Sequence, residues 1–366
     1  MTLLPLLHAG CHFFAGSRLG TPGKRLAVET AAIVREGGVV AQKVAQIVAA
    51  RPDLVSDVDL LAELRELQSR EISPGVHRAS IATVTLDRTR GVAVKRLNDD
   101  GVVSEGRAIA RLMAFVRPFR RNPQVSVLAD VLETLCHELD FESETDKNAL
   151  LRRSLPPRSC VRVPVTLRSS ATEVEMEIVE STLVKDLRGE RVELGLVRRF
   201  FKEMATSAVR TGVVHLDLHS GNVGVDAGRS RVVVYDMGSV RQIDAAVAKA
   251  AFSAMLQASE HLFFEEWDEL ARHLVEKRIV IEVRDVANLR LVARCAGRYA
   301  RGEATSLDIG RCLRRIKGDV NLDASIFQLV QSVSLLEGCC KVMNPDFHVA
   351  DALALNVFEV MGIMDG

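Results

Sequence analysis

The segment Thr211–Arg241 constrains the fold of this chain more than any other part of its sequence. It contains two short β-type runs, VGV and VVVY, which are separated by the turn-forming letters DAGRS and therefore predict a β-hairpin. Asn222 directly precedes the first run, and Asp236 directly follows the second. Because a hairpin brings its two ends together, we expect Asn222 and Asp236 to lie side by side, with Asp217 of the preceding polar turn facing the same space.

The side chains of this predicted cluster carry hard oxygen atoms. Such ligands suit Mg²⁺, which takes one or two protein oxygens and completes its shell with waters and nucleotide phosphates. Phosphoryl transfer by protein kinases uses a catalytic-loop Asp, an Asn five residues later and an Asp before Gly, which is the spacing of Asp217, Asn222 and Asp236. The alternative is structural, since Asp and Asn are common in turns for local hydrogen-bonding reasons.

Length and composition limit the remaining choices. A chain of 366 residues fits two lobes or two domains. Lys+Arg and Asp+Glu both number 48, so no overall charge favours nucleic acid, and no nucleic-acid partner is expected.

Seven cysteines without CxxC spacing favour reduced thiols inside the cell. The apolar N-terminal letters are too few to span a bilayer and favour a docking helix. We expect an intracellular protein that is soluble or peripherally bound to a membrane; its compartment and oligomeric state stay open.

The N-terminal third changes period once. Helical spacing of apolar residues runs from Lys24 to Leu67. Lys43 and Gln46 share a face of a helix in this range. Polar residues on such a face are usually exposed to solvent, so the pair could also be an ordinary solvated stripe. Alternation then predicts an antiparallel hairpin around the letters DRTRG, with Lys95 in its second strand.

Lys95 needs a partner if its stem is buried in this strand. The segment 125–153 reads as one long helix that carries Glu138, Asp140 and Glu144, the last two one turn apart on one face. Glu144 is the predicted partner of Lys95. A later predicted strand ends near Glu177, where the backbone that follows could contact a nucleotide base.

The order of these elements predicts an α+β, protein-kinase-like two-lobe fold with an N-terminal helical extension. The expected boundaries are 1–75 for the extension, 76–180 for an N-lobe of β-hairpins and one αC-type helix, and 181–366 for a helical C-lobe with the catalytic and metal-binding loops.

From about Gly37 to about Asp244, the chain resembles the atypical kinases of the UbiB/ADCK type, also called the aarF-domain family. KVAQ is similar to the KxGQ motif of that family, VAVK to its β3 lysine strand, and ELDFESE to its ELDxxxE signature. HLDLHSGN resembles HxDPHPGN, and YDMG stands where DFG is expected. The sequence departs from these motifs at Ala45, Leu218, Ser220 and Met237.

The resemblance implies a role for each candidate residue. Lys95 would hold nucleotide phosphates and pair with Glu144, Asp217 would be the catalytic carboxylate, and Asn222 and Asp236 would bind Mg²⁺. ATP or ADP would be the nucleotide, although the nucleotide loop is reduced to a short segment ending at Ser80. The resemblance also implies a regulatory lid, formed by Lys43, Gln46, Glu138 and Asp140.

The implied activity is that of an ATP- and Mg²⁺-dependent atypical kinase or ATPase. The resemblance places it in a small-molecule or lipid-related pathway, such as that of an isoprenoid quinone, rather than on protein substrates. Two alternatives stay open. One is a pseudokinase that acts as a nucleotide-binding regulatory or scaffold protein, and the other is a small-molecule kinase like the antibiotic phosphotransferases.

Overall fold

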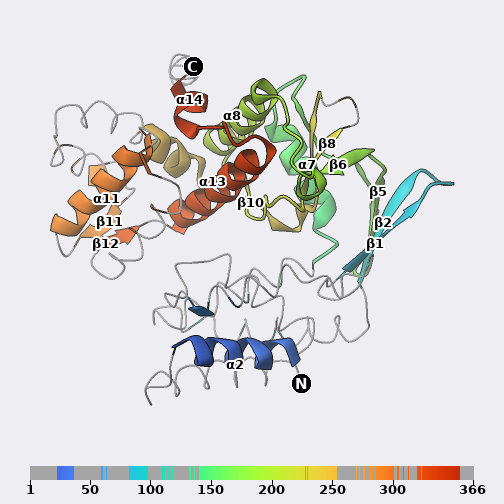
Figure 1. Ribbon diagram of the computed structural model, residues 1–366, viewed down its shortest axis with the longest axis horizontal. Coiled ribbons are helices and arrows are strands. Elements are labelled where there is room, and N and C mark those ends of the chain that lie inside the picture. Colours follow the sequence, from blue (N-terminus) through green and yellow to red (C-terminus); the bar gives the residue numbers. More distant parts are fainter. Residues whose placement is uncertain are drawn as a thin grey trace. The chain divides into compact units, whose positions relative to one another are not determined.

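The computed structural model, drawn in Figure 1, describes the following parts of the chain. They are residues 23–36, 59–60, 63, 82–97, 140–226, 228, 230–253, 280–283, 286–300, 320–322 and 324–354, with single positions at 109, 111, 114, 118, 132, 136, 269, 272, 275, 276, 303, 304, 308 and 312. Contacts between Cα atoms divide the chain into two compact units. The first comprises Met1–Glu144 and Thr166–Glu177, and the second comprises Thr145–Val165 and Ile178–Gly366.

The first unit contains an antiparallel sheet of four strands in the order β1-β2-β5-β4. Its strands are β1 (Ala82–Asp87), β2 (Val92–Leu97), β4 (Thr166–Ser169) and β5 (Glu173–Glu177). The β1–β2 pair is the hairpin predicted around DRTRG. Helix α2 (Gly23–Glu36), drawn in blue in Figure 1, also belongs to this unit and buries one apolar stripe.

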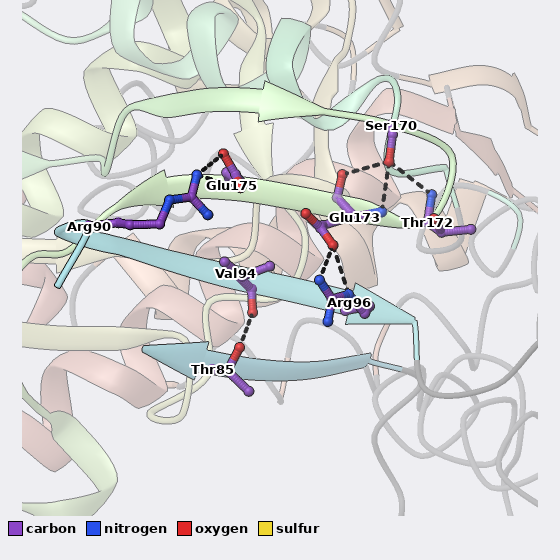
Figure 2. A network of polar contacts seen from close by, with 8 residues as sticks. All are labelled: Thr85, Arg90, Val94, Arg96, Ser170, Thr172, Glu173 and Glu175. Carbon is purple, nitrogen blue, oxygen red and sulfur yellow. Dashed lines mark hydrogen bonds and ion pairs between the residues drawn. The ribbon is translucent and has the colours of Figure 1, made fainter. Parts of the chain in front are cut away.

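Polar contacts tie the β1–β2 hairpin to β5 on the sheet face opposite Lys95 (Figure 2). Arg90 donates to Glu175 at 3.0 Å, and Arg96 donates through Nε to Glu173 at 2.7 Å. Successive side chains of a strand point to opposite faces, so Arg96 and Lys95 lie on different sides of β2. The two faces of β2 therefore differ in charge: one face carries the cross-strand ion pairs, and the other carries Lys95.

A second four-stranded sheet, ordered β3-β9-β8-β6, belongs to the second unit. The predicted hairpin of the segment Thr211–Arg241 is its β8–β9 pair, with Val223 opposite Val234. A further antiparallel pair joins β7 to β10. The strands are β3 (Val161–Arg162), β6 (Ser181–Leu183), β7 (Val213–His215), β8 (Val223–Asp226), β9 (Val232–Val234) and β10 (Val240–Gln242).

Helices cover these strands and form the main core of the second unit. Helix α8 contacts α13 and β7, and its ring of Phe201 lies 5.3 Å from that of Phe347. Gly212 caps the C-terminal end of α8 with a φ of 70°. Its Cα lies so close to the Ile243 carbonyl that a Cβ would not fit. The remaining elements are α7 (Glu144–Ser154), α8 (Leu194–Thr211), α11 (Val286–Ala300), α13 (Ala324–Met343), α14 (Val349–Ala354), and the strand pair β11 (Val280–Val283) and β12 (Val320–Leu322).

The prediction of one long helix over 125–153 was wrong at its centre. Asp140 to Ser143 are not helical, and α7 begins only at Glu144. Asp140 Oδ1 accepts a hydrogen bond from the Ser143 backbone at 3.2 Å, and Ser143 Oγ donates to the Asp140 carbonyl at 3.0 Å. Short polar side chains of this kind compete with helical hydrogen bonds, so the helix restarts here instead of continuing. Asp140 and Glu144 consequently do not share a helix face.

No helix among the described residues has the length and apolar character needed to cross a membrane.

Candidate functional site

Lys95 and Glu144 form a nearly dry ion pair within the first unit. Lys95 Nζ donates to Glu144 Oε1 at 3.1 Å and to Oε2 at 3.3 Å. The side chains are 13% and 3% exposed. The ammonium also lies 5.0 Å from the centre of the buried Phe141 ring, within the range of a cation–π contact. The pairing predicted from sequence is present, while the phosphate-binding role of Lys95 remains a prediction.

Local sequence explains how this pair is placed. Val92, Ala93 and Val94 are buried in the first half of β2. Successive side chains of a strand point to opposite faces, so Lys95 lies on the face away from Arg96. On the other side, the turn before α7 makes Glu144 the first helical residue, and its backbone donates to the Phe141 carbonyl at 3.1 Å. An acidic residue is favourable there, because the first turn of a helix carries a partial positive charge.

Asp217 and Asn222 are joined directly within the second unit. Asn222 Nδ2 donates to the Asp217 carbonyl at 3.0 Å and to Asp217 Oδ2 at 3.1 Å. Both amide hydrogens point at Asp217, so the side chain presents Oδ1 as its acceptor atom. The Tyr235 backbone donates to the Asn222 carbonyl at 2.9 Å, which closes the open end of the hairpin next to Asp236. The ends of the hairpin therefore meet beside the polar turn, while the position of the Asp236 side chain next to Asn222 and Asp217 stays a prediction.

Asp236 has an unusual backbone. Its φ of 59° and ψ of 76° place it in the left-handed region, where residues other than glycine are uncommon and strained. The short helical turn η3 (Met237–Ser239) follows it. The Gly238 carbonyl in this turn accepts from Lys147 Nζ at 3.0 Å and from Arg241 Nη1 at 2.9 Å. Lys147 and Arg241 thus fix the turn η3, which directly follows Asp236.

His215 connects the two halves of this cluster, and the sequence interpretation assigned it no role. Its ring is completely buried, and Nδ1 accepts from the Asp217 backbone at 3.2 Å. Nε2 therefore carries the hydrogen and donates to the Tyr235 carbonyl, also at 3.2 Å. Burial lowers the pKa of His215 to about 4, so the ring is neutral at neutral pH, as the acceptor role of Nδ1 requires. The signals in the sequence were its position after two valines and the first His of the HxDPHPGN-like motif.

His219 lies beside Asp217 at the surface of the same turn. Its Nδ1 accepts from the Gly221 backbone at 2.9 Å, which directs Nε2 toward Asp217 Oδ2 at 3.7 Å. A Cβ at position 221 would come within 2.7 Å of the His219 ring, so a larger residue there would require this exposed ring to move.

The oxygen atoms of this cluster fit Mg²⁺ better than a softer metal. Among the described residues, no three His, Cys, Asp or Glu side chains form a group able to hold a metal ion. Asn222 Oδ1 and the Asp236 carboxylate follow the pattern of Mg²⁺, which relies on few protein oxygens and on phosphate groups for the rest of its shell. Magnesium binding itself remains a prediction.

The other predicted site residues are less well defined. Glu177 ends β5 and is half-buried. Tyr235 Oη donates to the Val179 carbonyl at 3.1 Å and pairs with Ser181 Oγ at 2.7 Å, so the connection after Glu177 is fastened to the hairpin. Asp140 is exposed in the turn before α7. Four predicted residues lie outside the described part of the chain: Lys43, Gln46, Ser80 and Glu138.

A family model described as the ABC1 atypical kinase-like domain matches residues 72–265, slightly more than half of the chain. This chain belongs to the ABC1 atypical kinase-like family. The matched range contains the Lys95–Glu144 pair and the cluster of Asp217, Asn222 and Asp236. The predicted α+β, kinase-like fold and the resemblance to the UbiB/ADCK type are thereby confirmed.

Two relatives of the chain are similar over long stretches. A protein of Paramecium bursaria Chlorella virus 1, named as an ABC transporter, is 23% identical over 343 residues, which cover 86% of this chain and 72% of that protein. The chloroplastic protein ACTIVITY OF BC1 COMPLEX KINASE 7 of Arabidopsis thaliana is 21% identical over 263 residues. That match covers 67% of this chain and about a third (36%) of the plant protein.

One solved structure is also similar, that of Rv3197 from Mycobacterium tuberculosis in complex with erythromycin. It has a TM-score of 0.47 and 18% identity, and the match covers 72% of each chain. This likeness is too distant to add to the fold assignment.

Proposed function

We propose that this protein is an ATP- and Mg²⁺-dependent atypical kinase or ATPase of the UbiB/ADCK type. Its substrate would be a small molecule or a lipid-related compound of an isoprenoid quinone pathway, and not a protein. ADP is the alternative nucleotide. The protein would act inside the cell, soluble or peripherally attached to a membrane. Membership of the kinase-like family and the kinase name of the Arabidopsis thaliana relative support phosphoryl chemistry.

The observation that carries the proposal is the buried pair of Lys95 and Glu144. Taking two charges out of water costs free energy, and well-packed apolar side chains often give equal or greater stability. A lysine ammonium kept charged inside a valine-rich strand is therefore better explained by a ligand that needs it than by folding. Phosphate oxygens are such a ligand, and a lysine on the corresponding strand binds phosphates in protein kinases.

The remaining residues would divide the work as follows. Asn222 Oδ1 and the Asp236 carboxylate would hold Mg²⁺, which when bound neutralises the charge of the phosphates. Asp217, oriented by the Asn222 amide, would accept the proton of an attacking hydroxyl or water. His215 would keep the Asp217 turn and the Asp236 segment in register through its two ring nitrogens.

Two further assignments belong to the same proposal. Ser80 and the backbone after Glu177 would contact the nucleotide. The regulatory lid of the family would be formed here by Lys43, Gln46, Glu138 and Asp140.

Nucleotide-dependent thermal shift tests this function. We expect ATP or ADP with Mg²⁺ to stabilise the native chain by about 2.7 kcal/mol at a concentration one hundred times Kd. Asp236→Asn and Lys95→Ala should lose the metal-dependent part of this shift. Asp346→Asn and Arg96→Ala are matched controls, since both change an exposed ion pair and should keep the shift.

Turnover separates an enzyme from a pseudokinase. Asp217→Asn should lower ATP hydrolysis or phosphoryl transfer by about 10²–10⁴-fold, because it removes the proton acceptor while leaving nucleotide binding nearly intact. A native chain that binds nucleotide but shows turnover equal to that of Asp217→Asn would make the protein a pseudokinase. Absence of any nucleotide shift would refute the proposed function.

A further inference from the structure

Two cysteine thiols meet on helix α11, in the second unit and outside the residues assigned to the nucleotide. Cys295 lies on this helix, on the same face as Leu291 one turn earlier. Cys312 is buried, and its thiol donates to the Leu291 carbonyl at 3.5 Å, one turn before Cys295. Neither cysteine forms a disulfide in this structure. The Cys312 thiol is thus held against one turn of α11.

The surroundings of Cys295 differ from those of the buried cysteines. The neighbouring Cys312 thiol lowers the pKa of Cys295, and the nearby charge of Arg298 acts in the same direction, against partial burial and Asp308. Cys295 is only half-buried. Burial, in contrast, raises the pKa of Cys160 and of Cys339 to about 12. Since the thiolate is the reactive form, Cys295 is the more nucleophilic and the more accessible of these thiols.

We infer that Cys295 and Cys312 form an oxidisable dithiol, a site at which a peroxide converts two neighbouring thiols into a disulfide. Cys295 is the attacking residue because it is partly exposed. Cys312 is the resolving residue because it is buried and its sulfur lies against the turn of α11 that precedes Cys295. This order is the one expected for redox-sensitive cysteines, in which an accessible thiolate lies next to a second cysteine.

The chemistry balances with hydrogen peroxide as the oxidant. The Cys295 thiolate attacks one peroxide oxygen, so that a sulfur–oxygen bond forms, the oxygen–oxygen bond breaks, and the departing hydroxide takes up a proton to become water. The Cys312 thiolate then attacks the Cys295 sulfur, a disulfide bond forms, and the sulfenic oxygen leaves as a second water. Two thiols are oxidised, and one peroxide is reduced to two waters.

The test uses the full native chain and no nucleotide, so its outcome is independent of the proposed kinase activity. The chain is treated with hydrogen peroxide at neutral pH, its remaining thiols are alkylated under denaturing conditions, and non-reduced peptides are analysed by mass spectrometry. We expect a cross-linked peptide pair joining Cys295 to Cys312, which disappears after reduction. Recovery of both cysteines as alkylated thiols, or a disulfide formed mainly between other cysteines, would overturn the inference.

Single variants check the order of the two steps. Cys312→Ser should leave Cys295 as a sulfenic acid that dimedone labels, whereas Cys295→Ser should abolish the disulfide without labelling of Cys312. Cys339→Ser is the matched control and should form the disulfide at the native rate, since that thiol is buried with a raised pKa. Equal dimedone labelling of Cys295 and Cys312 in the two variants would contradict the assigned roles.

Discussion

The two β-hairpins of this protein, β1–β2 in the first unit and β8–β9 in the second, solve the same local problem in different surroundings. In each, the aspartate that ends the first strand accepts backbone hydrogen bonds from the turn. Asp87 Oδ1 accepts from Thr89 and Arg90, and Asp226 Oδ1 accepts from Ser230 and Arg231. Turn formation is therefore a property of the local sequence in both cases.

The strands themselves differ sharply in burial. All three residues of β9 are buried, whereas the four central residues of β1 are exposed. In the first hairpin only Val92, Ala93 and Val94 of β2 are buried, and the hairpin also carries cross-strand ion pairs and the Lys95–Glu144 pair. The second depends on an apolar core. Lys95 in the first hairpin is thus positioned by a charged partner, whereas Asn222 and Asp236 at the ends of the second hairpin are positioned by strands packed in the apolar core.

The largest effect on stability is expected at Lys95. Lys95→Ala leaves the Glu144 carboxylate buried without its cation and should lower the free energy of unfolding by about 3–5 kcal/mol. Arg96→Ala, one residue along the same strand, removes an exposed ion pair and should cost at most about 1 kcal/mol. Urea unfolding measures both. Equal losses would mean that the buried pair is as well solvated as the surface pair.

Acid should weaken the second hairpin through His215. In the unfolded chain this ring takes up a proton near pH 6.5, but in the folded chain only near pH 4, because of burial. Between these values the unfolded state binds more protons. The contribution of about 3 kcal/mol is therefore fully present above pH 6.5 and is lost as the pH falls toward 4.

This acid dependence is measured as the difference in unfolding free energy between the native chain and His215→Gln across that pH range. The difference should shrink as the pH falls. His348→Gln, at an exposed position, serves as the control and should change the free energy of unfolding by at most about 0.5 kcal/mol. A pH-independent difference for His215→Gln would show that this ring is not the titrating group.

Core packing should distinguish the two hairpins by about 2 kcal/mol. Val234→Ala removes fully buried carbon atoms and leaves a cavity, so it should cost about that amount. Val84→Ala removes the same atoms from a side chain that is 56% exposed and should stay within about 0.5 kcal/mol of the native chain. Thermal or urea unfolding compares them. A large effect of Val84→Ala would reveal that β1 is covered in solution.

The smallest effect concerns the glycines of the two turns. Gly91 has a φ of 68°, so Gly91→Ala should cost about 1 kcal/mol for the left-handed backbone, although a Cβ there has open space. Gly228 in the other turn has no such backbone, so Gly228→Ala should be neutral or slightly stabilising. If Gly228→Ala lowered the free energy of unfolding more than Gly91→Ala, the left-handed backbone of Gly91 would not be the feature that distinguishes the two turns.

Much of the candidate site could be predicted because it depends on short-range rules. Alternation placed Lys95 in a strand, and turn letters defined both hairpins. The pairing of Lys95 with Glu144 was also predictable, since a buried cation requires a partner and few acidic residues were suitably placed. His215 escaped prediction, because nothing in its letters distinguishes a ring that bridges two segments from an ordinary buried histidine.

The break before α7 and the backbone of Asp236 were equally hidden. In the first case, apolar spacing favoured one continuous helix, while local hydrogen bonds between Asp140 and Ser143 prevailed. In the second, a left-handed conformation is retained only where surrounding contacts compensate for its strain, and Lys147 and Arg241 fix the Gly238 carbonyl in the turn that follows Asp236.

Local chemistry therefore accounts for the elements, their turns and the residue types at the site. Burial, by contrast, emerges only when segments distant in sequence pack together. Packing makes His215 a neutral ring with a pKa of about 4, points the Asn222 amide at Asp217, and gives Cys295 a thiol neighbour 17 positions later in the sequence. The physical reason is that hydrogen bonding and turn preference act between near neighbours, whereas desolvation and charge pairing depend on the whole surroundings of a group.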